Sequence, residues 1–127
     1  MEGEGKALKA TSPTAKEIQA GVLRAIAHPT RLRILWELVR EEECVCHLSA
    51  LLGKPQPHVS QQLSSLKAAG LVLDRRDAQR IFYRPADPRI GELLRTVAAL
   101  AGLPEPSIGE RRPVPGCPCP KCDPGAR

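Results

Sequence analysis

Aromatic side chains and long apolar runs are both scarce in this sequence. The 127 residues include one Trp, one Tyr and one Phe, so a core built from one chain is small and a dimer interface is expected to support it. No apolar run is long enough to cross a bilayer, and the first residues, Met1–Gly5, lack the apolar segment of a secretory signal. We therefore predict a cytoplasmic protein with no membrane partner, in a compartment that keeps thiols reduced.

The signatures of the common enzyme classes are also missing. No nucleophile beside a base, no pair of carboxylates and no phosphate-binding glycine loop stands out in the sequence. The formal net charge is +5, which favours a polyanionic partner but is common among ordinary proteins. The sequence predicts a binding protein and not an enzyme.

The long apolar residues are confined to the middle of the chain. Both ends are rich in Gly, Pro, Ser and charge, which predicts tails at 1–13 and 104–127 around one domain at 14–103. Apolar residues at helical spacing and turn residues between them predict four helices, then a β-hairpin, then a last helix from Pro88. Leu71–Leu73 and Ile81–Tyr83 are the predicted hairpin strands. This order predicts a mainly α fold with a β-hairpin wing, a winged helix-turn-helix.

The segment from Leu48 to Ala69 is the candidate DNA-reading unit. A short helix and a turn at Gly53 precede a helix whose first half carries hydrogen-bonding side chains suited to base edges in the major groove. These side chains are Gln56, His58, Ser60, Gln61 and Gln62. Contacts to the DNA backbone are expected from Lys54 in the turn and, along phosphate or in the minor groove, from the wing residues Arg75, Arg76 and Arg80. A solvated surface would account for the same residues, and the neighbouring hairpin favours the DNA-binding interpretation.

Three segments together resemble the ArsR/SmtB family of metal-sensing repressors. They are Ala27–Leu35 (AHPTRLRIL), Gln56–Leu63 (QPHVSQQL) and Ala68–Val72 (AAGLV). The resemblance covers about residues 15 to 101 and implies a homodimer, with the first and last helices at the interface, that represses its own operon until an inducer binds. A two-fold dimer in turn predicts an inverted-repeat operator in double-stranded DNA. Pro55 departs from the family, which usually has a capping Ser there, so the start of the recognition helix is expected to be loosened or shifted.

Two cysteines precede the helix-turn-helix. Cys44-Val45-Cys46 resembles the Cys-Val-Cys metal box of the arsenic- and cadmium-sensing branches, which implies Cys44 and Cys46 as ligands of As(III), Sb(III), Cd(II), Pb(II) or Zn(II). In a regular helix, residues two apart point about 200° away from each other, so ligation by both sulfurs requires the helix start to unwind or to be irregular. Since that helix supports the recognition helix, its distortion is expected to misplace the DNA-reading face. His47 is expected on the helix surface and is left out of the site.

Other ligands of the family are missing. Ser49 occupies the position of the third cysteine of some arsenic sensors, residues 1–43 contain no cysteine of the kind that cadmium sensors use, and 87–103 contains no His for a zinc site on the last helix. The remaining thiols are in the C-terminal tail: Cys117, Cys119 and Cys122. An extended segment between Leu103 and Cys117 reaches about 40 Å. A tail cysteine then completes a three-sulfur site with Cys44 and Cys46, or the tail trio forms its own site, or the tail has no role in induction.

The sequence thus predicts a repressor that leaves its operator when As(III) or Sb(III) binds its thiolates. One alternative is the same repressor responding to Cd(II), Pb(II) or Zn(II). A second is a redox sensor in which the thiols form disulfides. A third is a metal-buffering protein, which leaves the recognition helix and the wing unexplained.

Overall fold

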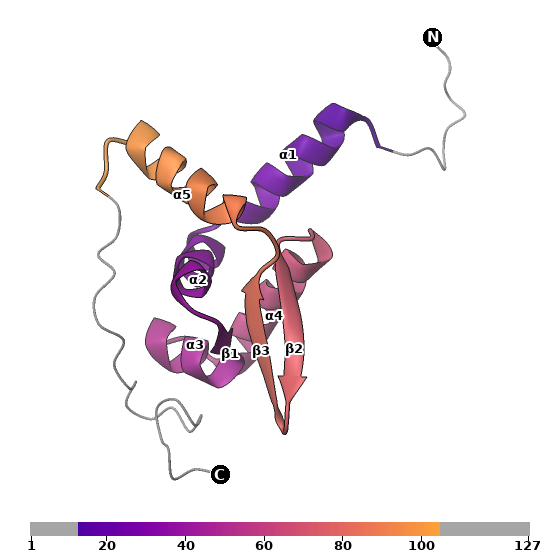
Figure 1. Ribbon diagram of the computed structural model, residues 1–127, viewed down its shortest axis with the longest axis vertical. Coiled ribbons are helices and arrows are strands. Elements are labelled where there is room, and N and C mark those ends of the chain that lie inside the picture. The colour runs from indigo at the N-terminus through magenta and orange to yellow at the C-terminus, as the bar shows by residue number, and fades with distance from the viewer. Residues whose placement is uncertain (1–12, 105–127) are drawn as a thin grey trace.

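The computed structural model describes residues 13–104, and Figure 1 shows their arrangement. This part of the chain contains five helices and three strands. In chain order they are α1 (Ala15–Ile26), α2 (Pro29–Arg40), β1 (Glu43–Cys44), α3 (Val45–Leu52), α4 (Gln56–Ala68), β2 (Val72–Asp77), β3 (Arg80–Pro85) and α5 (Arg89–Leu100). The predicted winged helix-turn-helix is confirmed. The predicted tails at 1–13 and 104–127 fall almost wholly outside the described residues and stay a prediction.

Side chains at the helix starts explain why α1 and α2 are separate. The Thr14 hydroxyl accepts a hydrogen bond of 3.1 Å from the backbone N–H of Glu17, whose carboxylate accepts one of 3.0 Å from the Thr14 backbone N–H. At the next start, His28 Nδ1 accepts a hydrogen bond of 3.2 Å from the backbone N–H of Thr30. Pro29 occupies the first turn of α2, where a missing N–H is no cost. The chain therefore breaks between the two helices at Ala27 and His28.

Glycines end both helices of the helix-turn-helix. Gly53 follows α3 with φ +67° and Gly70 follows α4 with φ +77°, a left-handed backbone that glycine adopts without steric cost. The Leu71 backbone N–H donates a hydrogen bond of 3.0 Å to the carbonyl of Leu66, and this bond closes the end of α4. At its other end α4 begins after Pro55, whose side chain makes no capping hydrogen bond. The cap that a Ser would supply is absent, as the sequence indicated.

The sheet contains one strand that the sequence did not predict. Its order is β1-β3-β2, and both neighbouring pairs are antiparallel. The short strand β1 pairs Cys44 with Phe82 in β3. The hairpin is also longer than predicted, because the expected loop at 74–80 shrinks to a turn at Ala78 and Gln79 between paired Asp77 and Arg80. The wing arginines consequently lie on strands and not in a loop.

The helices α1 and α5 extend away from the body of the domain, as Figure 1 shows, while α2, α3, α4 and the sheet lie together below them. Apolar side chains on the extending helices remain accessible, including Ile18 (55% exposed), Leu23 (57%) and Leu100 (83%). The base of α5 is buried through Ile90 and Leu94. No helix among residues 13–104 is both long and apolar enough to span a membrane.

Candidate nucleic-acid interface and thiol site

The outer face of α4 presents most of the side chains predicted to read bases. Gln56, Ser60 and Gln61 are exposed and His58 is half-buried, while Val59 and Leu63 are fully buried beneath them. Ser64 is exposed on the same side, one turn beyond Ser60, and was not among the predicted residues. The turn residue Lys54 is exposed beside the start of the helix. The structure therefore gathers these polar groups on one accessible helix face.

Gln62 does not belong to that face. A helix turns about 100° per residue, which carries Gln62 past the outer side and into the interior, where it is 8% exposed. Its amide oxygen accepts a hydrogen bond of 2.7 Å from Arg31 Nε in α2. The structure separates Gln62 from the exposed face on which it was predicted to read DNA bases, because its position in the helical repeat faces α2 and its amide is already bonded there.

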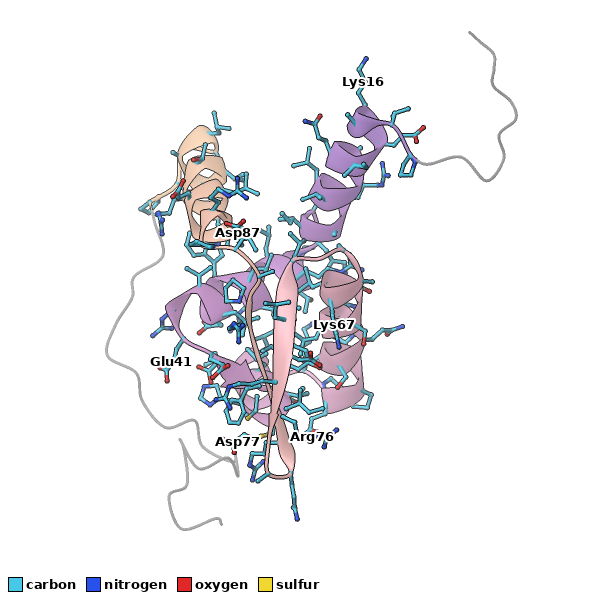
Figure 2. All side chains as sticks on the ribbon, turned by 45° about the vertical axis from the view of Figure 1, so that its right-hand side comes forward. Lys16, Glu41, Lys67, Arg76, Asp77 and Asp87 are labelled. Atoms are coloured by element: carbon cyan, nitrogen blue, oxygen red, sulfur yellow. The ribbon has the colours of Figure 1, made fainter. Side chains whose placement is uncertain are left out.

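The three wing arginines have different surroundings. Arg76 is exposed near the free end of β2, as Figure 2 shows. Arg75 is bound through two of its nitrogens to the Glu42 carboxylate at 2.8 and 2.7 Å, and its guanidinium lies 4.9 Å from the Phe82 ring centre. The hydrogen bonds that Arg75 donates to Glu42 raise the pKa of Arg75 above its ordinary value. Arg75 thus has a carboxylate partner that a DNA phosphate would have to replace.

A second cation near the wing is also paired. Lys67, on the exposed side of α4, lies 2.9 Å from an oxygen of Asp74 in β2, and both elements appear side by side in Figure 2. Their hydrogen bond raises the pKa of Lys67 and lowers the pKa of Asp74. The pair joins the recognition helix to the first strand of the wing.

The two cysteines of the Cys-Val-Cys segment converge. Their sulfurs lie 3.0 Å apart. Cys44 is the N-cap of α3 with an extended backbone, φ −91° and ψ 165°, whereas Cys46 lies in the first turn of the helix. Helix geometry required the start of α3 either to unwind or to be irregular. The irregular start is what the structure shows, because Cys44 lies just before the helix and α3 itself runs unbroken from Val45. No unwinding of α3 is needed for both sulfurs to face one ion.

The sulfur separation is close to what a shared ion requires. Two thiolates on a tetrahedral zinc, with bonds of about 2.3 Å, lie about 3.8 Å apart, while a disulfide brings its sulfurs to about 2.05 Å. The observed 3.0 Å lies between these values, and small side-chain rotations reach either one. Within residues 13–104, no group of three or more His, Cys, Asp or Glu side chains is arranged to hold a metal ion. The pair therefore fits as two ligands of an incomplete site.

The thiol pair packs against the wing. Cys44 is 3% exposed and forms a small buried cluster with Phe82, on which Cys46 and Ala50 pack. Arg80, the first residue of β3, points Nη1 at the sulfur of Cys46 from 3.4 Å. The sequence assigned Arg80 to DNA and Cys46 to an inducer, and gave no sign that the two are in contact. Their contact depends on the pairing of β1 with β3.

His47 and Glu43 flank the cysteines inside the protein. The expectation that His47 lies on the helix surface is wrong, since it is 1% exposed, and Glu43 is fully buried. His47 Nε2 lies 3.5 Å from the nearer carboxylate oxygen of Glu43. Glu43 is the last residue of the acidic run Glu41-Glu42-Glu43, and no hydrophobic pattern in the sequence could reveal that it faces inward. The predicted ligands Cys117, Cys119 and Cys122 lie outside the described residues.

Comparison with known proteins identifies the family. The model of the arsR family of bacterial regulatory proteins matches residues 28–73. The chain is 39% identical over 101 residues to the biofilm growth-associated repressor of Agrobacterium fabrum, covering 80% of this chain and 86% of that protein. This protein belongs to the arsR family. Its relatives are regulators of transcription and not enzymes.

Two further relatives extend this result. The probable mercury resistance operon repressor of Streptomyces lividans is 39% identical over 92 residues, covering 69% of this chain and 70% of that protein. The solution structure of a homodimeric winged helix-turn-helix DNA-binding domain from Mycobacterium bovis superposes with a TM-score of 0.65 at 31% identity, covering 74% of this chain and 91% of that one. The fold observed in this arsR-family member is thus that of a DNA-binding domain.

Proposed function

We propose that this arsR-family protein is a repressor that binds an inverted-repeat operator and leaves it when As(III) or Sb(III) binds Cys44 and Cys46. The observation that carries the proposal is the 3.0 Å separation of the two sulfurs at the root of the helix-turn-helix. Soft ions prefer thiolate ligands, and a relative bears the name of a mercury resistance repressor. The same thiols would also take Cd(II), Pb(II) or Zn(II).

The DNA-binding face is proposed from exposure and charge. Gln56, Ser60 and Gln61 on α4 supply the groups that read base edges, with His58 at the margin of the face. Lys54 and Arg76 are exposed cations that suit phosphate. Arg75 and Arg80 are already engaged with Glu42 and Cys46, so their part in DNA binding depends on these contacts.

A homodimer is proposed from the surface of α1 and α5. Both helices extend from the body (Figure 1) and expose apolar side chains that no other residue within 13–104 covers. The related M. bovis domain is homodimeric. A two-fold dimer places its recognition helices about 34 Å apart, which matches one turn of DNA.

A third sulfur is proposed from the C-terminal tail. Since the described residues supply two thiols and no third suitable ligand, one of Cys117, Cys119 and Cys122 completes a trigonal site for As(III). Replacing these three residues by Ser is expected to weaken arsenite binding while leaving DNA binding intact. If arsenite then still binds as tightly to the Cys44/Cys46 pair, the tail is not part of the inducer site.

The test of the proposed function is a titration of promoter DNA from this protein's own gene. Full-length protein is bound to the labelled DNA and exposed to As(III), Sb(III), Cd(II), Pb(II) and Zn(II) in turn. Release is expected with As(III) and Sb(III), and not from the variant carrying both Cys44→Ser and Cys46→Ser. Arsenite release of that variant at the wild-type concentration contradicts the proposal.

The sulfur separation also favours a second candidate, a redox-sensing repressor. A peroxide oxidises the two thiols to one disulfide, with loss of two protons and two electrons, and is itself reduced to water. The sulfurs would approach by about 1 Å to reach bonding distance. Release of DNA by peroxide in metal-free buffer, reversed by dithiothreitol, supports this candidate, whereas release by arsenite under reducing conditions supports the first.

A further inference from the structure

We propose that Arg80 couples the thiol pair to the wing, so that an ion captured by Cys44 and Cys46 weakens the hold of the wing on DNA. The inference rests on the proposed function, because it assigns the route by which an ion at that site affects DNA binding. It departs from the expectation that the ion acts by distorting α3.

The first observation is that the thiols and the recognition helix are held in different clusters. Cys44 and Cys46 pack with Phe82 and Ala50. The buried side of α4 belongs to the main core, where Val59, Leu63 and Leu66 are fully covered. A change at the sulfurs therefore meets the wing strand β3 directly, whereas α4 is held by contacts that do not involve the sulfurs.

The second observation is that two residues on one face of β3 touch the thiol segment. Phe82 is paired with Cys44 in the strand register, and Arg80 reaches the Cys46 sulfur at 3.4 Å. Side chains two residues apart in a strand point to the same side. Arg80 is also the register partner of Asp77 next to the turn, so its position fixes the outer end of the wing.

The chemistry of sulfur makes this contact sensitive to an ion. The Arg80 N–H donates to lone pairs of the Cys46 sulfur, and a sulfur–ion bond uses the same lone pairs. An ion bound to this sulfur also brings its own positive charge close to the Arg80 guanidinium, and like charges repel. Arg80 then loses its contact with Cys46, while the backbone pairing of β1 with β3 still holds the strand beside the thiol segment.

A second side-chain link between the wing and the thiol segment does not depend on sulfur. Arg75 in β2 binds Glu42, immediately before β1, at 2.7 and 2.8 Å. Besides the backbone pairing of β1 with β3, two arginine side chains link the wing to the thiol segment, and of these two Arg80 is the one that contacts a sulfur. Loss of the Arg80 contact is expected to shift the end of the wing without detaching it.

The experiment compares the effect of arsenite on DNA affinity in matched variants. The dissociation constant of full-length protein for its promoter DNA is measured by fluorescence anisotropy with and without saturating arsenite, in wild type, Arg80→Gln and Arg76→Gln. Arg76 is an exposed cation on the same wing that the thiol cluster does not include. The ratio of the two dissociation constants measures the coupling between the sites.

We expect Arg80→Gln to bind arsenite at least as tightly as wild type, because the competing contact is gone, while its ratio falls about fivefold or more, within the usual range of coupling. Arg76→Gln is expected to bind DNA more weakly in both states with an unchanged ratio. Arg80→Lys retains the charge and is expected to give an intermediate ratio. A purely structural role for residue 80 would not produce that intermediate value. Arg80→Lys also serves as the test variant if Arg80→Gln folds poorly.

The two proposals fail in different ways. If wild type and Arg80→Gln show the same ratio at the same arsenite occupancy, the coupling does not pass through Arg80, although the repressor responds to arsenite. If wild type itself shows a ratio of one while arsenite occupies Cys44 and Cys46, the proposed function is wrong and this inference is wrong with it.

Discussion

Arg31 and Gln62 connect the recognition helix to the corner between α1 and α2. Arg31 Nε donates a hydrogen bond of 2.7 Å to the Gln62 amide oxygen, and Arg31 Nη1 donates one of 3.2 Å to the Ala25 carbonyl near the end of α1. One side chain therefore bonds to the helix proposed to read DNA and to the helix proposed to form the dimer. This contact gives the two proposed surfaces a fixed relation within one subunit.

Gln62→Ala should destabilise the protein. The substitution leaves a partly buried guanidinium N–H without its acceptor, which costs about 1–3 kcal/mol of unfolding free energy. Chemical denaturation measures the change. Gln61→Ala is the matched control, since replacing the exposed Gln61 is expected to change DNA affinity and leave the free energy of unfolding unchanged. Equal unfolding free energies for the two variants would show that the Arg31–Gln62 contact contributes little to stability.

Ala78→Gly should stabilise the wing. Ala78 has φ +58° in the two-residue turn between β2 and β3, a left-handed backbone that costs an L-residue with a side chain about 1 kcal/mol. Glycine removes that cost, so the free energy of unfolding should rise by about 1 kcal/mol. Thermal unfolding of the two proteins checks this, and a lower melting temperature for Ala78→Gly would be inconsistent with the turn observed.

Acidification should reveal the contribution of Asp87 at the start of α5. Its carboxylate accepts hydrogen bonds from the side chain and the backbone N–H of Arg89, which lower the pKa of Asp87 from its ordinary value of 3.8 to about 2. Because the folded pKa lies below the unfolded one, the stability from Asp87 is present above the unfolded pKa and is lost as the pH falls through the folded value.

Asp87→Asn removes this titration. The difference in unfolding free energy between wild type and Asp87→Asn should therefore be largest near neutral pH and shrink below the unfolded pKa. Denaturation curves collected between neutral and strongly acidic pH measure it. A difference that stays constant through the acidic range would mean that the Arg89 contacts do not favour the ionised carboxylate.

Charges placed on the accessible apolar faces should separate the proposed dimer. Leu23→Glu on α1 and Leu100→Glu on α5 replace exposed side chains, so each subunit should stay folded while sedimentation reports monomers. Loss of the second recognition helix should then lower operator affinity by about a hundredfold or more. Leu73→Glu, on the exposed side of β2, is the control, and this variant is expected to stay dimeric. If Leu23→Glu and Leu100→Glu also stay dimeric, the dimer interface lies elsewhere.

The elements were predictable from the sequence where local signals are strong. Thr14, Pro29, Gly53 and Gly70 mark helix ends through capping, ring geometry or positive φ, and each mark coincides with an observed boundary. The hairpin was located, but its turn was placed too broadly because Ala78 and Gln79 carry none of the usual turn residues. The two residues of β1 are too few to show a strand pattern.

The contacts around the thiols were not predictable, because they join segments far apart in the chain. The approach of Arg80 to Cys46 spans 34 positions and follows only from the pairing of β1 with β3. Similarly, Gln62 was assigned to the DNA face because its residue type matches its neighbours, while its helical phase turns it toward Arg31. Residue type indicated the chemistry of each site. Strand pairing and helical phase decided which residues come together in that site.

The most direct test of the account follows sulfur occupancy and DNA affinity in the same sample. Arsenite is added to the protein on labelled promoter DNA while ultraviolet absorption reports arsenic–sulfur bonds and anisotropy reports bound DNA. We expect the DNA to be released in step with bond formation in wild type and to remain bound in the variant lacking both Cys44 and Cys46 thiols. Full arsenic–sulfur absorption with unchanged anisotropy in the wild-type protein would contradict the account.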